Sequence, residues 1–417
     1  MEEKAKKYQI EETRENKELC KTKDNFNFKI KKGKGNLNSL NQTKYKKSFA
    51  KFLSIKRMLL ISIIFNIHLT ISEYQTITLQ IYGGQNQSII NEKYKNFLKE
   101  IYINGLKQTN IESRYDLIES NNTIKLVFNS KLTDLSNMFR DCFNIYEIDF
   151  IDFNTSKIEL INGLFHNCTS LKSINLEEWD IKEVKNLNCL FYNCRSLTSL
   201  KLPNFETPES INSMFFNCRN LTSIDLSTIN TSKVTNMGHL FYNCSSLTSL
   251  DLINFDTSSV IYLDNMFNGC TGLISLNLSN FNTSNVQYMN FTFFGCTGLI
   301  SLNLSNFDTS QVKTINSTFG YCKNLTYIDL SNFDTSKVTD MWDAFKNCVS
   351  LVSLNISNFN TSNVINMAGM FYDCPSIISL DLASFDTSRV TRMDGMFYNC
   401  KSITSLNLSN FNTSNLK

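Results

Sequence analysis

The stretch Ser246–Thr271, SLTSLDLINFDTSSVIYLDNMFNGCT, contains two periodicities and decides the fold. Leu250 and Leu252 alternate with more polar neighbours, a period of two that predicts a short strand with one buried face. The segment DTS that follows has the composition of a turn. Four apolar residues then have the spacing i, i+3, i+4 and i+7 of one helix side: Leu263, Met266, Phe267 and Cys270. The stretch predicts a strand, a turn and a short helical segment.

Cysteine shows how often this unit recurs. Of the 13 cysteines, 11 are separated by steps of 26 residues, with a single step of 24: Cys142, Cys168, Cys194, Cys218, Cys244, Cys270, Cys296, Cys322, Cys348, Cys374 and Cys400. A fixed period of this length is typical of a solenoid, in which each unit buries its apolar side against its neighbours. We therefore predict an α/β, leucine-rich-repeat-like solenoid of about eleven repeats, with a parallel β-sheet on one face and short helical turns on the other.

The repeats occupy residues 128–417, and the 417-residue chain divides further before them. Residues 73–127 do not repeat. In that region ITLQIYGG, EIYINGLKQ and TIKLVF are typical of strands, and NEKYKNFLKEI is typical of a short helix. Because a solenoid needs an end that covers its first core layer, we interpret residues 73–127 as a small α+β N-terminal cap.

The first 72 residues have a different character. Residues 1–57 carry 17 Lys or Arg against 7 Asp or Glu. We interpret them as a basic leader that its composition predicts to be disordered, or as an annotation extension with translation beginning at Met58. Residues 58–72 form a mostly apolar run after Lys56 and Arg57, too short for a spanning helix but suited to a signal peptide. An uncleaved signal anchor is the alternative. Both predict export.

The pattern LxxLxLxxF, followed by DTSKVTNM and MFYNC, resembles the repeat of the BspA-like leucine-rich-repeat surface proteins. The resemblance covers roughly residues 128–417, with departures at WDIKEV (Trp179–Val184) and near Pro208. It implies an extracellular or cell-surface, non-enzymatic protein used in adhesion or host interaction.

Candidate chemistry is sparse. The three histidines lie at His68, His166 and His239, in different contexts, and no HExxH, GxSxG or phosphate-binding Gly-rich motif occurs. We therefore expect no enzyme, no cofactor and no metal site. Residues 58–417 carry 24 Lys or Arg against 31 Asp or Glu, an acidic balance that argues against a nucleic-acid partner.

Three features leave alternatives. The cysteine column fits a ladder of buried thiols, disulfides between layers, or, least well, a metal site. The DTS turns offer carboxylates to calcium, but Asn replaces Asp in alternate copies, which argues against a site there. The carboxylates concerned are Asp256, Asp308, Asp334 and Asp386. The NTS sequons follow from the repeat itself and permit glycans without indicating them.

The only extended candidate site is a column of short polar side chains on the predicted strands. We call it the strand-face column: Asp225, Asp251, Asn277, Asn303, Asp329, Asn355, Asp381 and Asn407. Such residues either keep an exposed sheet face soluble or form a multivalent contact surface.

These observations predict an exported surface protein that mediates adhesion or recognition and binds a protein or glycan on another cell or matrix. Its contact with a membrane would run only through a signal anchor or a C-terminal anchor missing from this chain. The alternatives are a structural coat component without a specific ligand and an intracellular interaction scaffold. Since many copies share the contact, single substitutions on the strand-face column should have little effect on binding.

Overall fold

The computed structural model describes three stretches: residues 74–129, 132–151 and 153–417. They belong to one compact unit, Tyr74–Lys417. The predicted leader at residues 1–57 and the signal segment at residues 58–72 lie outside the described residues. Nowhere in the described stretches is there a helix with the length and apolar character needed to cross a membrane.

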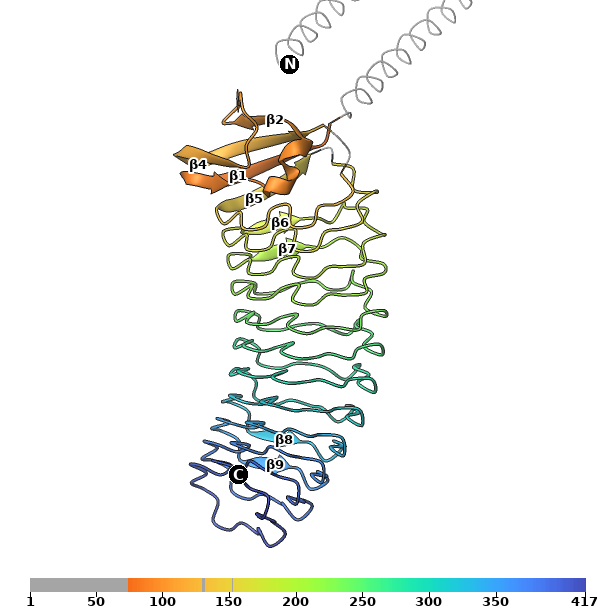
Figure 1. Ribbon diagram of the computed structural model, residues 1–417, viewed down its shortest axis with the longest axis vertical. Coiled ribbons are helices and arrows are strands. Elements are labelled where there is room, and N and C mark those ends of the chain that lie inside the picture. The colour runs from red at the N-terminus through yellow and green to blue at the C-terminus, as the bar shows by residue number, and fades with distance from the viewer. Residues whose placement is uncertain (1–73, 130–131, 152) are drawn as a thin grey trace, which may run out of the picture. The chain divides into compact units, whose positions relative to one another are not determined.

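The unit begins with an antiparallel sheet (Figure 1) in the strand order β3-β2-β4-β1-β5. The strands are β1 (Thr76–Ser88), β2 (Leu98–Ile103), β3 (Leu106–Lys107), β4 (Arg114–Phe128) and β5 (Ile145–Ile151). Along β1, the buried residues Ile77, Leu79 and Ile81 alternate with more exposed ones, so one face of the strand packs on the core. The three strand predictions made before the repeats are confirmed.

The predicted short helix NEKYKNFLKEI is only partly correct. Residues Glu92–Phe97 form a 3₁₀ helix, η1, and β2 starts at the next residue. Asn91 begins η1 by accepting a hydrogen bond from the Lys93 N–H at 3.0 Å. The helix ends early because the residues after it pair with β4, where Ile101 stands opposite Leu126.

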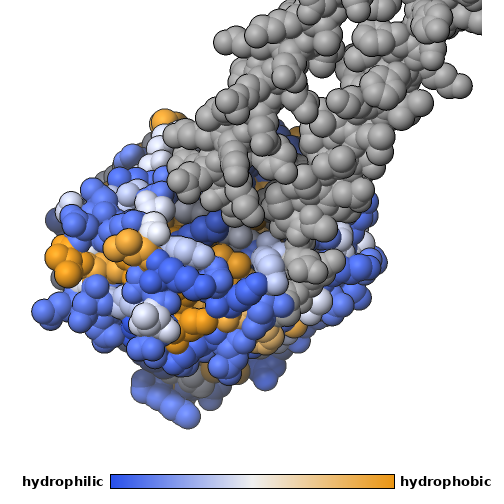
Figure 2. Space-filling view, turned by 90° about the horizontal axis from the view of Figure 1, so that it is seen from above, coloured by the Kyte–Doolittle hydropathy of each residue, from blue (hydrophilic) through white to orange (hydrophobic). Residues whose placement is uncertain are grey.

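Strand β5 connects this sheet to the repeats. It pairs antiparallel with β1, as at Leu79 and Ile148, and contacts β6 of the next layer on its other side (Figure 1). The sheet therefore covers the first repeat. Seen from above, the visible surface over this end is mostly hydrophilic, with hydrophobic side chains scattered between (Figure 2).

The repeats stack layer on layer along the rest of the unit (Figure 1). Their short strands pair in parallel with an offset of one repeat, β6 (Ser173–Asn175) with β7 (Ser199–Lys201) and β8 (Tyr327–Asp329) with β9 (Ser353–Asn355). In repeats without an assigned strand the same alternation persists, since Leu250 and Leu252 are buried and Asp251 is exposed. We call this side the strand face.

The opposite side, which we call the turn side, does not contain the predicted helical turns. Apart from η1, no helix occurs in the described residues. The Leu240 and Cys244 N–H groups bond to carbonyls three residues back, at 3.3 and 3.1 Å, as in successive β-turns. The N–H groups of Phe241 and Asn243 instead donate to Met266 and Asn268 of the next repeat, at 2.9 and 2.6 Å.

Left-handed residues explain why no helix forms. Each turn segment has two of them, four residues apart, as at His239 and Asn243, both with φ of 56°. A right-handed helix cannot pass through such residues, and Asn, Asp and Gly, which tolerate this conformation best, occupy most of the positions. Turns repeated every four residues still place apolar side chains on one side, so the spacing resembled that of a helix.

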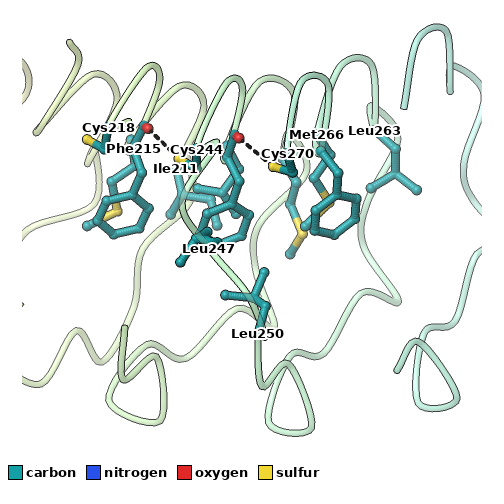
Figure 3. Packing of buried hydrophobic residues seen from close by; sticks show 14 of the residues in the cluster. Ile211, Phe215, Cys218, Cys244, Leu247, Leu250, Leu263, Met266 and Cys270 are labelled. Atoms are coloured by element: carbon teal, nitrogen blue, oxygen red, sulfur yellow. Dashed lines mark hydrogen bonds between the residues drawn. The ribbon is translucent and has the colours of Figure 1, made fainter. Parts of the chain in front are cut away.

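The core lies between the strand face and the turn side (Figure 3). Leu250 enters it from the strand face and Met266 from the turn side, and both are buried, as is Phe267. The Phe267 ring stacks between those of Phe241 and Phe293, with centroid distances of 6.0 and 5.7 Å. One such ring per layer gives the core a continuous aromatic row.

Candidate recognition surface

The strand-face column alternates with the buried strand residues, which turns its side chains outward. Asp251 stands between Leu250 and Leu252, and Asp329 stands between Ile328 and Leu330. Pairing of β8 with β9 brings Asp329 opposite Asn355 in the next layer. The structure thus places the column on the strand face as predicted, while its role in binding stays a prediction.

Each column residue also has a structural task that the sequence reasoning missed. Its Oδ1 atom accepts a hydrogen bond from the backbone N–H two residues on, which starts the turn after the strand. The Asp251 oxygen accepts from Ile253 at 3.0 Å, and the Asn277 oxygen accepts from Ser279 at 3.1 Å. Because only an oxygen is required, Asp and Asn exchange freely along the column. At Asp225, hydrogen bonds from the hydroxyl and the N–H of Ser227 stabilise the carboxylate and lower its pKa.

An exposed row of aliphatic side chains runs beside the strand-face column. We call it the aliphatic stripe: Ile274, Ile300, Val352 and Ile378, which are 56%, 53%, 42% and 55% exposed. Tyr327, 49% exposed, lies in the layer between Ile300 and Val352. Each stripe residue stands four positions after a column cysteine, where earlier repeats have Thr198, Thr222 and Thr248. A comparison of this position across the repeats would have revealed the stripe from the sequence.

Backbone hydrogen bonds connect the stripe from layer to layer. The Ile300 N–H donates to the Ile274 carbonyl at 3.4 Å, and Thr326 continues the series to Ile300 at 3.4 Å. Val352 then donates to Thr326 at 2.9 Å, and Ile378 to Val352 at 3.4 Å. The backbone at the stripe position is therefore connected across five successive layers, and the middle layer has Thr326 in place of an aliphatic residue.

The DTS turns are occupied by internal hydrogen bonds. Asp308 Oδ1 accepts from the Ser310 N–H at 2.9 Å, and the buried Thr309 hydroxyl donates to the Asp334 carbonyl of the next repeat at 3.0 Å. The same Oδ1 bond to the serine two residues on recurs at Asp256, Asp334 and Asp386. In the described part of the chain, no group of three or more His, Cys, Asp or Glu could hold a metal ion.

The cysteine column forms a ladder of free thiols. The first ten cysteines of the column, from Cys142 to Cys374, are buried, and Cys400 is half-buried. None of them forms a disulfide. The thiols of Cys244 and Cys270 donate to the carbonyls of Phe215 and Phe241 in the preceding layer, at 3.1 and 3.0 Å (Figure 3). Burial raises the pKa of Cys270 to about 12, so the thiol stays protonated.

The two described histidines lie in separate repeats. His166 stacks on Tyr192 with ring centroids 4.5 Å apart, and burial lowers its pKa. Burial also lowers the pKa of His239, three repeats further on. The His166 imidazole therefore belongs to a stacked row of rings, whereas His239 lies tilted against Phe216 with ring centroids 6.2 Å apart.

The molecule is thus a solenoid of stacked repeats with an exposed strand face. Its sequence matches the family described as "Mycoplasma protein of unknown function, DUF285" three times, over residues 109–223, 209–328 and 315–417. These matches span most of the chain, and the chain belongs to this family. A search of curated proteins gave no match.

Solved structures with detectable likeness include repeat proteins of several kinds. A leucine-rich repeat protein from Eubacterium ventriosum is 17% identical, with a TM-score of 0.36, over 69% of this chain and 85% of that one. The plant peptide hormone receptor RGFR1 in complex with RGF2 is 17% identical, with a TM-score of 0.22, over 54% of this chain and 43% of that one. The TLR13–ssRNA13 complex is 15% identical, with a TM-score of 0.20, over 60% of this chain and 48% of that one.

Proposed function

We propose that this chain is an exported, BspA-like cell-surface protein that recognises a partner on another cell or matrix through the strand face of its solenoid, without catalysis. The observation that carries the proposal is the aliphatic stripe, whose four side chains are 42–56% exposed beside the strand-face column. They form two neighbouring pairs on either side of the Thr326 layer, and clustered exposed aliphatic groups of this kind are typical of protein contacts. The apolar run at residues 58–72 supports export.

The strand face has the composition of a protein-binding surface more than that of a glycan-binding one. It combines aliphatic side chains with short carboxylates and amides, and four of the five layers from Ile274 to Ile378 add an aliphatic side chain. Many weak contacts of this kind sum to a useful affinity when the partner engages several layers. A glycan partner and a coat component without a ligand are the competing functions.

Two experiments test the proposal. First, surface biotinylation of intact, unpermeabilised cells should label the chain. Labelling that requires permeabilisation would contradict export and favour the intracellular scaffold. Second, the purified full chain should bind target cells, and protease treatment of those cells should abolish binding. Loss on glycosidase treatment alone would favour a glycan, and no binding to any cell or matrix would favour the coat component.

A triple variant locates the contact. Ser275→Arg, Ser301→Arg and Ser353→Arg place long side chains on the strand face, where all three serines are exposed, without altering the core or the turn-starting oxygens. Binding should be lost. The matched control changes exposed residues elsewhere on the repeats: Gln311→Arg, Thr339→Arg and Ile365→Arg. Equal loss in both variants would move the contact away from the strand face.

A further inference from the structure

We propose that the aliphatic stripe and the neighbouring carboxylates bind a basic amphipathic α-helix of a partner protein, lying along the stack from the layer of Ile274 to that of Ile378. This inference rests on the proposed function and specifies its partner. It starts from the position of the stripe, where Thr198, Thr222 and Thr248 show that a polar residue fits the same backbone. Fold alone therefore does not require aliphatic side chains there.

The spacing of the stripe selects a helix. Layers joined by strand-type hydrogen bonds lie about 4.8 Å apart, so the four steps from Ile274 to Ile378 span about 19 Å. A helix places one apolar residue per turn of about 5.4 Å, and about 13 residues cover that length. In an extended chain, side chains on one face are about 6.6 Å apart, which differs more from the layer spacing of about 4.8 Å. Its side chains would therefore no longer lie over the layers after two or three contacts.

Charge fixes which helix fits. Asp329 and Asp381 are exposed and stand two layers apart in the strand-face column, about 10 Å along the stack. Two basic residues seven positions apart on a helix are separated by about 10.5 Å, which matches. Lys323 lies on the other side of the stripe, three residues before Thr326, so basic residues are favoured on one flank of the helix only.

The width of the surface agrees with this orientation. Column residues follow stripe residues by three positions, about 10 Å of extended chain, which is close to the diameter of a helix. Small serines fill most of the space between, at Ser275, Ser301, Ser353 and Ser379. A helix seated on the stripe therefore reaches Asp381 over Ser379, whereas it reaches Asp329 over the exposed ring of Tyr327, which takes the place of the serine in that layer.

The test uses two synthetic peptides of about 15 residues with identical composition. The first has leucines at the spacing i, i+3, i+7, i+10 and i+14, with two lysines seven residues apart on one flank. The second carries the same residues in strict alternation. Binding to the full chain is followed by fluorescence anisotropy, and peptide helicity by circular dichroism. We expect the first peptide to bind and become helical, and the second to bind at least about tenfold more weakly.

Variants of the chain sharpen the result. One variant combines four changes on the stripe: Ile274→Thr, Ile300→Thr, Val352→Thr and Ile378→Thr. Its affinity for the helical peptide should be at least about tenfold lower, and its thermal unfolding should be unchanged. The double variant Asp329→Asn with Asp381→Asn should lower the affinity for the helical peptide by a smaller factor, and binding should depend less on salt concentration. The controls are Ile253→Thr with Ile365→Thr, both exposed outside the stripe, and Asp225→Asn with Asp251→Asn, outside its layers.

Equal binding of the two peptides would overturn the helical partner, as would full binding to the fourfold threonine variant. Either result leaves the proposed function standing, because cell binding and its loss in the triple arginine variant are measured separately. If the helical peptide binds while the chain recognises no cell or matrix, the helix site stands and the proposed surface role fails.

Discussion

The strand face and the turn side of one repeat are joined to the next repeat in different ways. On the turn side, four N–H groups of one repeat, from Met237 to Asn243, donate to carbonyls of the next at 2.6–3.0 Å. On the strand face of comparable layers, residues 222–226 make no backbone hydrogen bond to residues 248–252. In other layers the strand face is also joined through its backbone, as where β8 pairs with β9. The turn side therefore makes the more regular connection along the stack, and the strand face is freer to vary in sequence.

Side-chain contacts strengthen this difference. Behind the turn side lie the stacked phenylalanines and the thiol ladder, and the buried threonines of the DTS turns join successive layers. Residues of the strand-face column hydrogen-bond mainly within their own repeat, as Asp251 does with Ile253. We therefore expect changes on the turn side to reduce stability and changes on the strand face to alter binding.

The largest expected effect is alkaline unfolding. Burial raises the pKa of Cys142, Cys270 and Cys322 from 9.0 to about 12. Above pH 9 these thiols lose protons in the unfolded chain and keep them in the folded one, so the free energy of unfolding falls as pH rises. Each contributes about 1.4 kcal/mol per pH unit. Urea midpoints measured by circular dichroism should fall steeply between pH 9 and about 11.

Thiol labelling provides the control for that prediction. At pH 8 the folded chain should leave the buried column unlabelled by iodoacetamide, while the partly exposed Cys189 and Cys400 react slowly, because partial burial raises the pKa of these thiols too. In urea all cysteines should react. A urea midpoint that does not change from pH 8 to 10.5 would contradict the linkage between thiol burial and stability.

The next largest effect is expected in the aromatic row. Phe267→Ala removes a buried ring stacked between Phe241 and Phe293 and should lower the free energy of unfolding by about 3–5 kcal/mol, because the rigid layers above and below limit collapse of the cavity. Urea unfolding measures this loss of free energy. Ile300→Ala, on the strand face, is the matched control and should cost less than about 1 kcal/mol. Similar losses for both would abolish the distinction between the two sides.

The sequence predicted the layers and the core better than it predicted the conformation of the turn side. Leu250, Phe267 and Cys270 are buried as their periodicity indicated. The helix prediction is wrong because repeated turns and a helix give nearly the same apolar spacing. The distinguishing signal was present in Asn265 and Gly269, four residues apart, since both have left-handed φ angles of 58° and 73°.

The candidate site could be located from the sequence but not interpreted fully. Alternation placed Asp251 on the outside, yet its hydrogen bond to the Ile253 N–H depends on the chain turning directly after the strand. A column of Asp and Asn looks the same whether its oxygens start turns or contact a ligand. The aliphatic stripe was overlooked because Ile274 and Ile300 resemble core residues until the bend before the strand exposes them.

A smaller effect is expected at the threonines between layers. Thr309→Val keeps the shape of the side chain but removes the hydroxyl that donates to the Asp334 carbonyl at 3.0 Å, and should cost about 1–2 kcal/mol. Thr309→Ser retains the donor and serves as the control, with a loss limited to one buried methyl group. Differential scanning calorimetry should order the melting temperatures as wild type, Ser, then Val. A valine variant as stable as wild type would show that this ladder contributes nothing to the stack.

The smallest effect is expected on the strand face itself. Asp251→Asn retains the Oδ1 acceptor for the Ile253 N–H, as Asn277 does in the next repeat, and should change the free energy of unfolding by less than about 0.5 kcal/mol. Asp251→Ala removes that acceptor and should cost about 0.5–1.5 kcal/mol. Parallel urea titrations of the two variants decide between the roles of the side chain. If Asn is as damaging as Ala, the column carboxylates act through their charge, and the free exchange of Asp and Asn along the strand face needs another explanation.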